Sequence, residues 1–168
     1  MASWAAKVLA LALALGGDGP PQCPPELFRI TRSTNANVVL YEAHEASSGT
    51  LDGEAPVRAV WLMLAEDGRR EELTGLEWRL AYGVEVRRPA EPAAAVVTLR
   101  AQPRRPVAIR QREGCFVAST LIGGHEAQLR SIHVVVGRGL WPTVRSVELF
   151  GVDLETGEEL RESVASAP

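Results

Sequence analysis

A glutamate among apolar neighbours is the residue of this sequence whose setting most suggests chemistry. Glu148 lies in the alternating segment 144–153, in which both faces carry apolar side chains. A carboxylate that faces a core must be paired, or its pKa must shift. Arg32 and Arg79 are the available partners. We therefore expect a buried ion pair or a ligand-contacting carboxylate, and we predict that Arg32 and Glu148 belong to one polar cluster.

Two asparagines that flank an alanine form the second candidate. Asn35 and Asn37 follow an alternating segment that ends near Arg32. Asparagine tolerates left-handed backbone and bonds to nearby backbone groups, so the pattern is typical of a turn or bulge. In the alternative interpretation, the two amides surround a polar ligand together with Arg32 and Tyr41.

Aromatic side chains supply the remaining candidates. Trp61, Trp78, Tyr82 and Trp141 are expected to be packing anchors, and Trp78 and Tyr82 stand four residues apart, as a helical pair would. A platform for a sugar or lipid is the alternative. The candidate ligand-binding residues are therefore Arg32, Asn35, Asn37, Tyr41, Trp61, Arg79, Tyr82 and Glu148.

Patterns typical of catalysis and of cofactor binding are missing. No Gly-x-Ser-x-Gly elbow accompanies His44, His125 and His133, and two cysteines with three scattered histidines make no zinc pattern. No phosphate-binding or dinucleotide-binding loop occurs. A net charge of −3 argues against a nucleic-acid partner. We predict no catalytic residue, no metal and no cofactor.

The amino terminus resembles a secretory signal peptide. An unbroken apolar run covers residues 8–15, which is too short to span a bilayer, and glycines and prolines follow it. We expect residues 1–16 to be the signal, residues 17–26 a Pro-rich leader, and the product to be periplasmic or secreted without a transmembrane span. An uncleaved anchor or a wrongly assigned start codon is the alternative. In an oxidising compartment Cys23 and Cys115 either pair or remain two separate thiols, and spacing does not decide between these.

Short alternating segments separated by turn-forming residues predict the fold. The only helical spacing occurs in residues 71–82, where Leu73, Leu76 and Leu80 share one face and Gly83 follows. We predict an all-β antiparallel barrel or sandwich of about 8–10 strands with one short helix, in a single domain of residues 27–165. The expected strands are residues 27–33, 38–45, 57–64, 84–87, 95–101, 107–112, 116–122, 127–136, 144–153 and 159–164.

Several separated pieces resemble one bacterial family, domain of unknown function 4833. They comprise LFRI with RS and NANVV near the start, PV with Trp61, then EELT and LAYGV, and finally VELFG with Asp153 and TG. The resemblance covers about residues 27–160 and departs in the Ala- and Arg-rich middle, residues 87–112. It implies an exported protein with one fold and carries no activity with it.

Three functions agree with these observations. The first is a non-catalytic binding or interaction module of the cell envelope, with a small polar ligand or an envelope component as its partner. The second is a purely structural envelope protein, and the third is a hydrolase that uses Glu148 as acid or base. A cavity lined by Trp61, Tyr82 and Glu148 would favour the first function over the second, and the third requires a second titratable group beside Glu148 in an open cleft.

Overall fold

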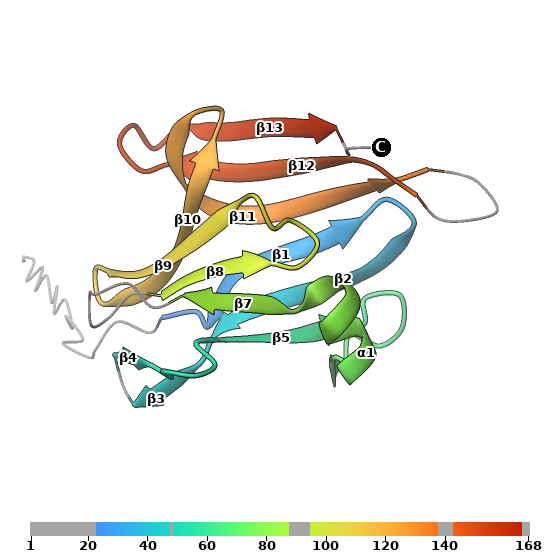
Figure 1. Ribbon diagram of the computed structural model, residues 1–168, viewed down its shortest axis with the longest axis horizontal. Helices are drawn as coiled ribbons and strands as arrows, with labels where there is room; N and C mark the ends of the chain where they lie inside the picture. Colours follow the sequence, from blue (N-terminus) through green and yellow to red (C-terminus); the bar gives the residue numbers. More distant parts are fainter. Residues whose placement is uncertain (1–22, 48, 88–94, 138–142, 166–168) are drawn as a thin grey trace, which may run out of the picture.

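One curled sheet makes up most of the molecule (Figure 1). The computed structural model describes residues 23–47, 49–87, 95–137 and 143–165. In this part of the chain, eleven strands form a half-barrel sheet, and two short strands form a separate ribbon. The predicted all-β fold with one short helix is confirmed. The predicted signal peptide, residues 1–16, lies outside the described residues.

The strands follow the alternation of the sequence closely. The strands of the large sheet are β1 (Glu26–Arg32), β2 (Asn35–Ala43), β5 (Val57–Leu62), β6 (Arg70–Glu72), β7 (Val84–Arg87), β8 (Ala95–Leu99), β9 (Pro106–Arg112), β10 (Cys115–Ile122), β11 (His125–Val136), β12 (Val144–Asp153) and β13 (Glu159–Ala165). The ribbon consists of β3 (Glu45–Ser47) and β4 (Thr50–Leu51). Strands β3, β4 and β6 were not predicted, because two or three residues are too few to show a period.

The sheet forks at β11. Strand β12 pairs with one edge of β11 along residues 127–136. The other edge is therefore shared, with β10 pairing at residues 125–128 and β1 at residues 131–134. One arm of the fork continues from β1 through β2 and β5 to β6, and the other continues from β10 through β9 and β8 to β7.

The fork corrects one part of the predicted architecture. Strands β1 and β11 run parallel, so the sheet is mixed rather than wholly antiparallel. A parallel pair requires a long crossover connection, and the chain between β1 and β11, which builds both arms, provides it. Alternation within a strand says nothing about this direction.

The two arms curl towards each other and enclose the core. Buried side chains from both arms belong to one cluster, in which the ring of Phe28 stacks on that of Tyr41 at 4.5 Å between centroids. The largest members of this cluster are Leu27, Phe28, Ile30, Tyr41, Trp61, Leu99, Ile109, Phe116, Ile122, Leu129, Ile132 and Leu149. The concave face of the half-barrel is therefore filled along most of its length.

The helical segment differs from its prediction. Helix α1 (Gly75–Glu77) continues directly into the π-helical turn η1 (Trp78–Tyr82), while residues 70–72 form β6 against β5. Of the three leucines predicted to share a face, only Leu73, which lies before the helix begins, packs against the core. Leu76 and Leu80 are 58% and 71% exposed, whereas Trp78 and Tyr82 pack against the core. The larger aromatic side chains gain more from burial, and they decide which face turns inward.

Candidate functional site

A polar cavity of about 290 Å³ opens beside the helical segment. It is bounded by the end of β1, the start of β2, strands β5 and β6, and α1. Four of its lining residues were predicted as ligand-binding candidates, namely Arg32, Asn35, Asn37 and Trp61. The full lining consists of Arg32, Asn35, Asn37, Trp61, Met63, Glu71, Glu72, Thr74 and Glu77.

Arg32 is the cation of this cavity. Its guanidinium carbon lies 5.0 Å from the ring centre of Trp61 and 5.8 Å from that of Tyr82. These contacts fix the guanidinium by cation–π attraction without using its N–H groups. Among the described residues no side chain forms a hydrogen bond or an ion pair with Arg32. Its donor edge therefore remains available to a ligand or to water.

The two rings beneath Arg32 are themselves held from the core. Trp61 and Tyr82 meet edge to face, with centroids 5.3 Å apart. The hydroxyl of Tyr41 donates to the backbone carbonyl of Tyr82 at 2.8 Å, and burial raises the pKa of Tyr41 far above its usual range. Tyr41 is completely buried and does not line the cavity. Tyr41 therefore positions Tyr82 and, through Tyr82, the pair of rings on which Arg32 stacks.

Burial also raises the pKa of the Tyr82 phenol. The nearby positive charge of Arg32 acts in the opposite direction, and the negative charge of Glu77 adds to the rise. Tyr82 therefore remains a neutral aromatic surface for Arg32 at neutral pH.

The two asparagines shape the rim. The Asn35 side-chain oxygen accepts from the backbone N–H of Asn37 at 2.8 Å, and the Asn37 oxygen accepts from the backbone N–H of Ala65 at 2.9 Å. The register of β1 against β2 shifts between Ile30 and Arg32, so the predicted bulge is confirmed. Each amide oxygen therefore accepts one backbone hydrogen bond, and each amide group retains two N–H donors for which no protein partner occurs among the described residues.

Glu77 was missed by the sequence analysis. Its carboxylate accepts from the backbone N–H and the hydroxyl of Thr74, each at 2.9 Å, and from the indole N–H of Trp61 at 3.2 Å. Partial burial acts to raise the pKa of Glu77, but these hydrogen bonds and the charge of Arg32 hold it below its usual value. The spacing Thr74-x-x-Glu77 is a capping box, and this signal was readable in the sequence.

The predicted cluster of Arg32 with Glu148 is wrong. Along the sheet, Thr31 is opposite His133, which is opposite Glu148, so Thr31 rather than Arg32 shares the face of Glu148. Glu148 instead pairs with Arg161 of β13, at 2.8 Å between Nη2 and Oε1. Arg32, one position further along β1, points to the concave face.

Arg79, the other predicted partner, does not reach Glu148 either. Its Nε donates to the Gly75 carbonyl at 3.3 Å, within the helical segment, and it does not line the cavity. Of the eight candidates, the structure therefore gathers Arg32, Asn35, Asn37 and Trp61 around one cavity, with Tyr82 beneath Arg32. It leaves Tyr41, Arg79 and Glu148 away from it.

The histidines have separate settings. His44 contacts the Ala55 carbonyl, His125 lies 3.2 Å from Asp153, and the Nδ1 of His133 lies 2.8 Å from the Thr31 hydroxyl. In residues 23–165, apart from the undescribed gaps, no three His, Cys, Asp or Glu side chains are placed to hold a metal ion.

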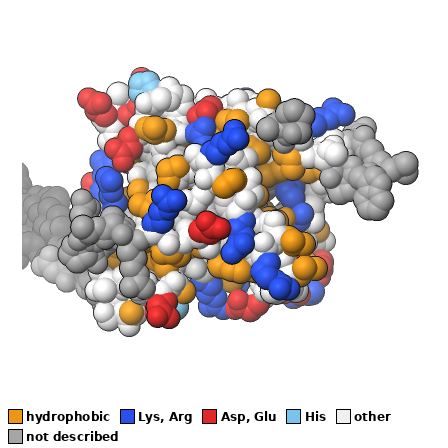
Figure 2. Space-filling model, in the orientation of Figure 1, with side chains coloured by type: hydrophobic (Ala, Val, Ile, Leu, Met, Phe, Trp, Pro, Cys, Tyr) orange, Lys and Arg blue, Asp and Glu red, His pale blue; other side chains and the backbone are white. Residues whose placement is uncertain are grey.

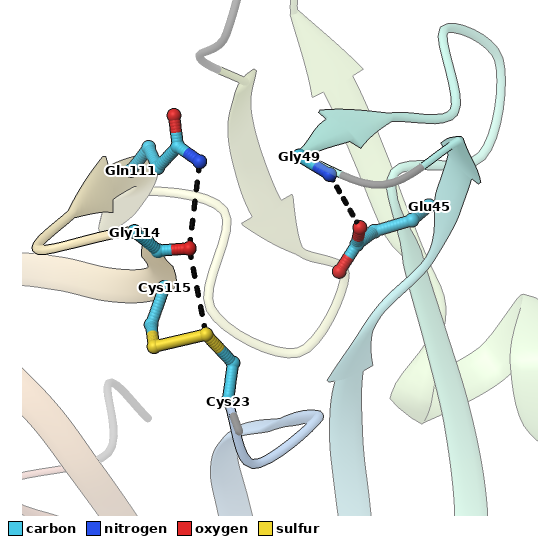
Figure 3. The surroundings of a disulfide bond; sticks show 6 residues. All are labelled: Cys23, Glu45, Gly49, Gln111, Gly114 and Cys115. Carbon is cyan, nitrogen blue, oxygen red and sulfur yellow. Dashed lines mark hydrogen bonds between the residues drawn. A yellow bond between two sulfur atoms is a disulfide. The ribbon is translucent and has the colours of Figure 1, made fainter. Parts of the chain in front are cut away.

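Cys23 and Cys115 form a disulfide bond (Figure 3). The bond joins the segment before β1 to the first residue of β10, the two strands that share an edge of β11. Gly114, beside Cys115, directs its carbonyl to the side chain of Gln111 and to the sulfur of Cys23. The pairing that spacing left open is therefore present.

The face seen in Figure 2 carries no single-sign charge patch. Basic and acidic side chains are interspersed there with hydrophobic ones. No helix in the described residues has the length and apolar character that crossing a membrane requires.

Together, the half-barrel, its disulfide and its stacked arginine define a small β-domain with a polar cavity beside Arg32. The model of the family described as Domain of unknown function (DUF4833) matches residues 28–163. The chain belongs to this family, as its resemblance to the family implied. No curated protein and no solved structure matches it.

Proposed function

We propose that this protein is a non-catalytic binding module whose site is the cavity beside Arg32. The observation that carries the proposal is an arginine fixed by two aromatic rings, with its donor edge unused by the described residues. Asn35 and Asn37 add further donors at the rim. The ligand is a small polar molecule that places a carboxylate, phosphate or carbonyl group against Arg32.

We further propose that the binding module acts outside the cytoplasm. The apolar run of residues 8–15 and the glycines after it support an export signal. The Cys23–Cys115 disulfide supports an oxidising compartment.

Protein recovered from the periplasm or the medium is expected to begin within a few residues of Gly17. Removal of the apolar run by a signal peptidase is the physical reason. Mass spectrometry of the intact chain and amino-terminal sequencing measure this directly. Accumulation in the cytoplasm of a chain that still begins at Met1 would contradict export.

Ligand binding is tested by titrating ¹⁵N-labelled protein with acetate, succinate, inorganic phosphate, glucuronate and L-alanine. We expect saturable shifts of the Arg32 Nε–H and Trp61 Nε1–H resonances for at least one probe. Arg32→Gln should weaken that binding by about tenfold or more, because a charge-assisted pair is lost. Arg32→Lys should weaken it too, since the planar fork is lost.

Arg79→Gln is the matched control, because Arg79 is exposed, lies on the helical segment beside the cavity and does not line the cavity. Its affinity should equal that of the wild type. Thermal unfolding of each variant shows whether Arg32→Gln remains folded. Absence of a saturable shift with all probes, or equal losses in the Arg32 and Arg79 variants, would overturn the proposed site.

A further inference from the structure

We infer that the ligand of this cavity is a zwitterion of amino-acid size, with its carboxylate on Arg32 and its ammonium group on Glu77. This inference rests on the proposed function and adds the charge pattern of the ligand to it. It follows from the balance of charges around the cavity.

The cavity has one cation and three carboxylates in its lining. Glu71 accepts from Nε of Arg69 at 2.7 Å, and Glu72 is paired with Arg58. Among the described residues, no basic side chain lies within ion-pair distance of Glu77, and no acidic side chain lies within ion-pair distance of Arg32. After the internal pairs are removed, one positive and one negative group remain at the cavity.

Both remaining groups are held in place before a ligand arrives. Arg32 rests on Trp61 and Tyr82, and the carboxylate of Glu77 is fixed by Thr74 and Trp61. Three donors leave part of the capacity of this carboxylate unused, because two carboxylate oxygens offer about four acceptor sites. An ammonium group could therefore bind without displacing the bonds that orient Glu77, and a preorganised site loses little entropy on binding.

The surroundings select against other charge types. The carboxylate of Glu77, which has no ion-pair partner among the described residues, disfavours a multiply charged anion such as phosphate, because like charges repel at short range. A ligand with only a positive charge would leave the N–H donors of Arg32 without an acceptor, and it would be repelled by the charge of the guanidinium. A volume of about 290 Å³ suits a small molecule.

The experiment compares three forms of the same molecule. L-alanine is a zwitterion, N-acetyl-L-alanine keeps only the carboxylate, and L-alaninamide keeps only the ammonium group; L-glutamine and L-leucine with their corresponding derivatives repeat the comparison with longer side chains. Binding is followed by the Arg32 and Trp61 side-chain resonances. We expect the zwitterion to bind about tenfold or more tightly than either derivative in at least one series.

Variants identify the two ends. Glu77→Gln should preserve the capping box, because glutamine is also found at the N3 position of this motif. In this variant the amino acid and its N-acetyl form should bind with nearly equal affinity. Arg32→Gln should remove the advantage over the amide. Glu66→Gln is the control, since Glu66 is exposed, pairs with Arg69 and does not line the cavity. It should retain both preferences.

The outcomes distinguish a failure of the zwitterion inference from a failure of the proposed binding function. Equal binding of L-alanine and N-acetyl-L-alanine in every series, or binding of acetate or succinate through Arg32 with no amino acid bound, would overturn the zwitterion and leave the binding module standing. Loss of every probe, anions included, would overturn both. A preference for the zwitterion that survives Glu77→Gln would also overturn the assignment of the ammonium end.

Discussion

Replacing Cys23 and Cys115 together by alanine is expected to lower the free energy of unfolding by about 4 kcal/mol. The disulfide joins residues 92 positions apart, so its loss releases a long loop in the unfolded chain. In the folded protein the disulfide joins β1 to β10 at the ends where the two strands diverge. Only residues 29–32 of β1 and residues 119–122 of β10 pair with β11. Urea denaturation, followed by tryptophan fluorescence, measures the change.

Reduction of the wild-type protein supplies the matched comparison, because it breaks the same bond without altering the sequence. Reduced wild-type protein and the double alanine variant should unfold at nearly the same urea concentration, well below that of the oxidised wild type. A midpoint that does not move on reduction would show that the fork is held by packing alone.

Gly83→Ala is expected to destabilise the protein by about 3 kcal/mol and to disturb the cavity. The Gly83 N–H closes the π-helical turn on the Trp78 carbonyl at 2.8 Å, and an added Cβ would lie 2.1 Å from that same oxygen. The φ of Gly83 is −67°, so the demand is for space rather than for a left-handed backbone. Either the turn opens or Tyr82 moves, and Tyr82 supports Arg32.

Gly75→Ala is the control within the same helical segment, because an added Cβ at Gly75 meets nothing within 4 Å. Alanine also favours the helix, so this variant should be neutral or slightly more stable than the wild type. Thermal unfolding measures both variants, and the Trp61 and Arg32 resonances report on the cavity. Equal stability of the two variants would contradict the packing argument at Gly83.

The strand segments were readable from the sequence because burial on a half-buried strand follows a period of two. Strands β7 and β12 have the predicted bounds, and most others differ by one to three residues at an end. The helical segment was placed in the right region but began too early. The acidic residues Glu71 and Glu72 were interpreted as a helix start, whereas pairing with β5 makes them part of strand β6.

The candidate site shows a similar division. Arg32, Asn35, Asn37 and Trp61 were identified from their types and their places in alternating segments, and they do line one cavity. The predicted partner Glu148 was wrong. Alternation shows which residues of one strand share a face. It does not show which residues of a neighbouring strand lie on the same side of the sheet. Thr31 and Arg32 are neighbours in sequence and lie on opposite sides of the sheet.

The sequence by itself therefore determined the all-β class and the positions of most strands, because both depend on contacts between residues close along the chain. Only the tertiary structure decided that β1 runs parallel to β11, that Cys23 meets Cys115, and that Arg32 stacks on Trp61 and Tyr82. These contacts join residues far apart in sequence. They depend on how the two arms of the sheet curl around one core, and no local pattern encodes that closure.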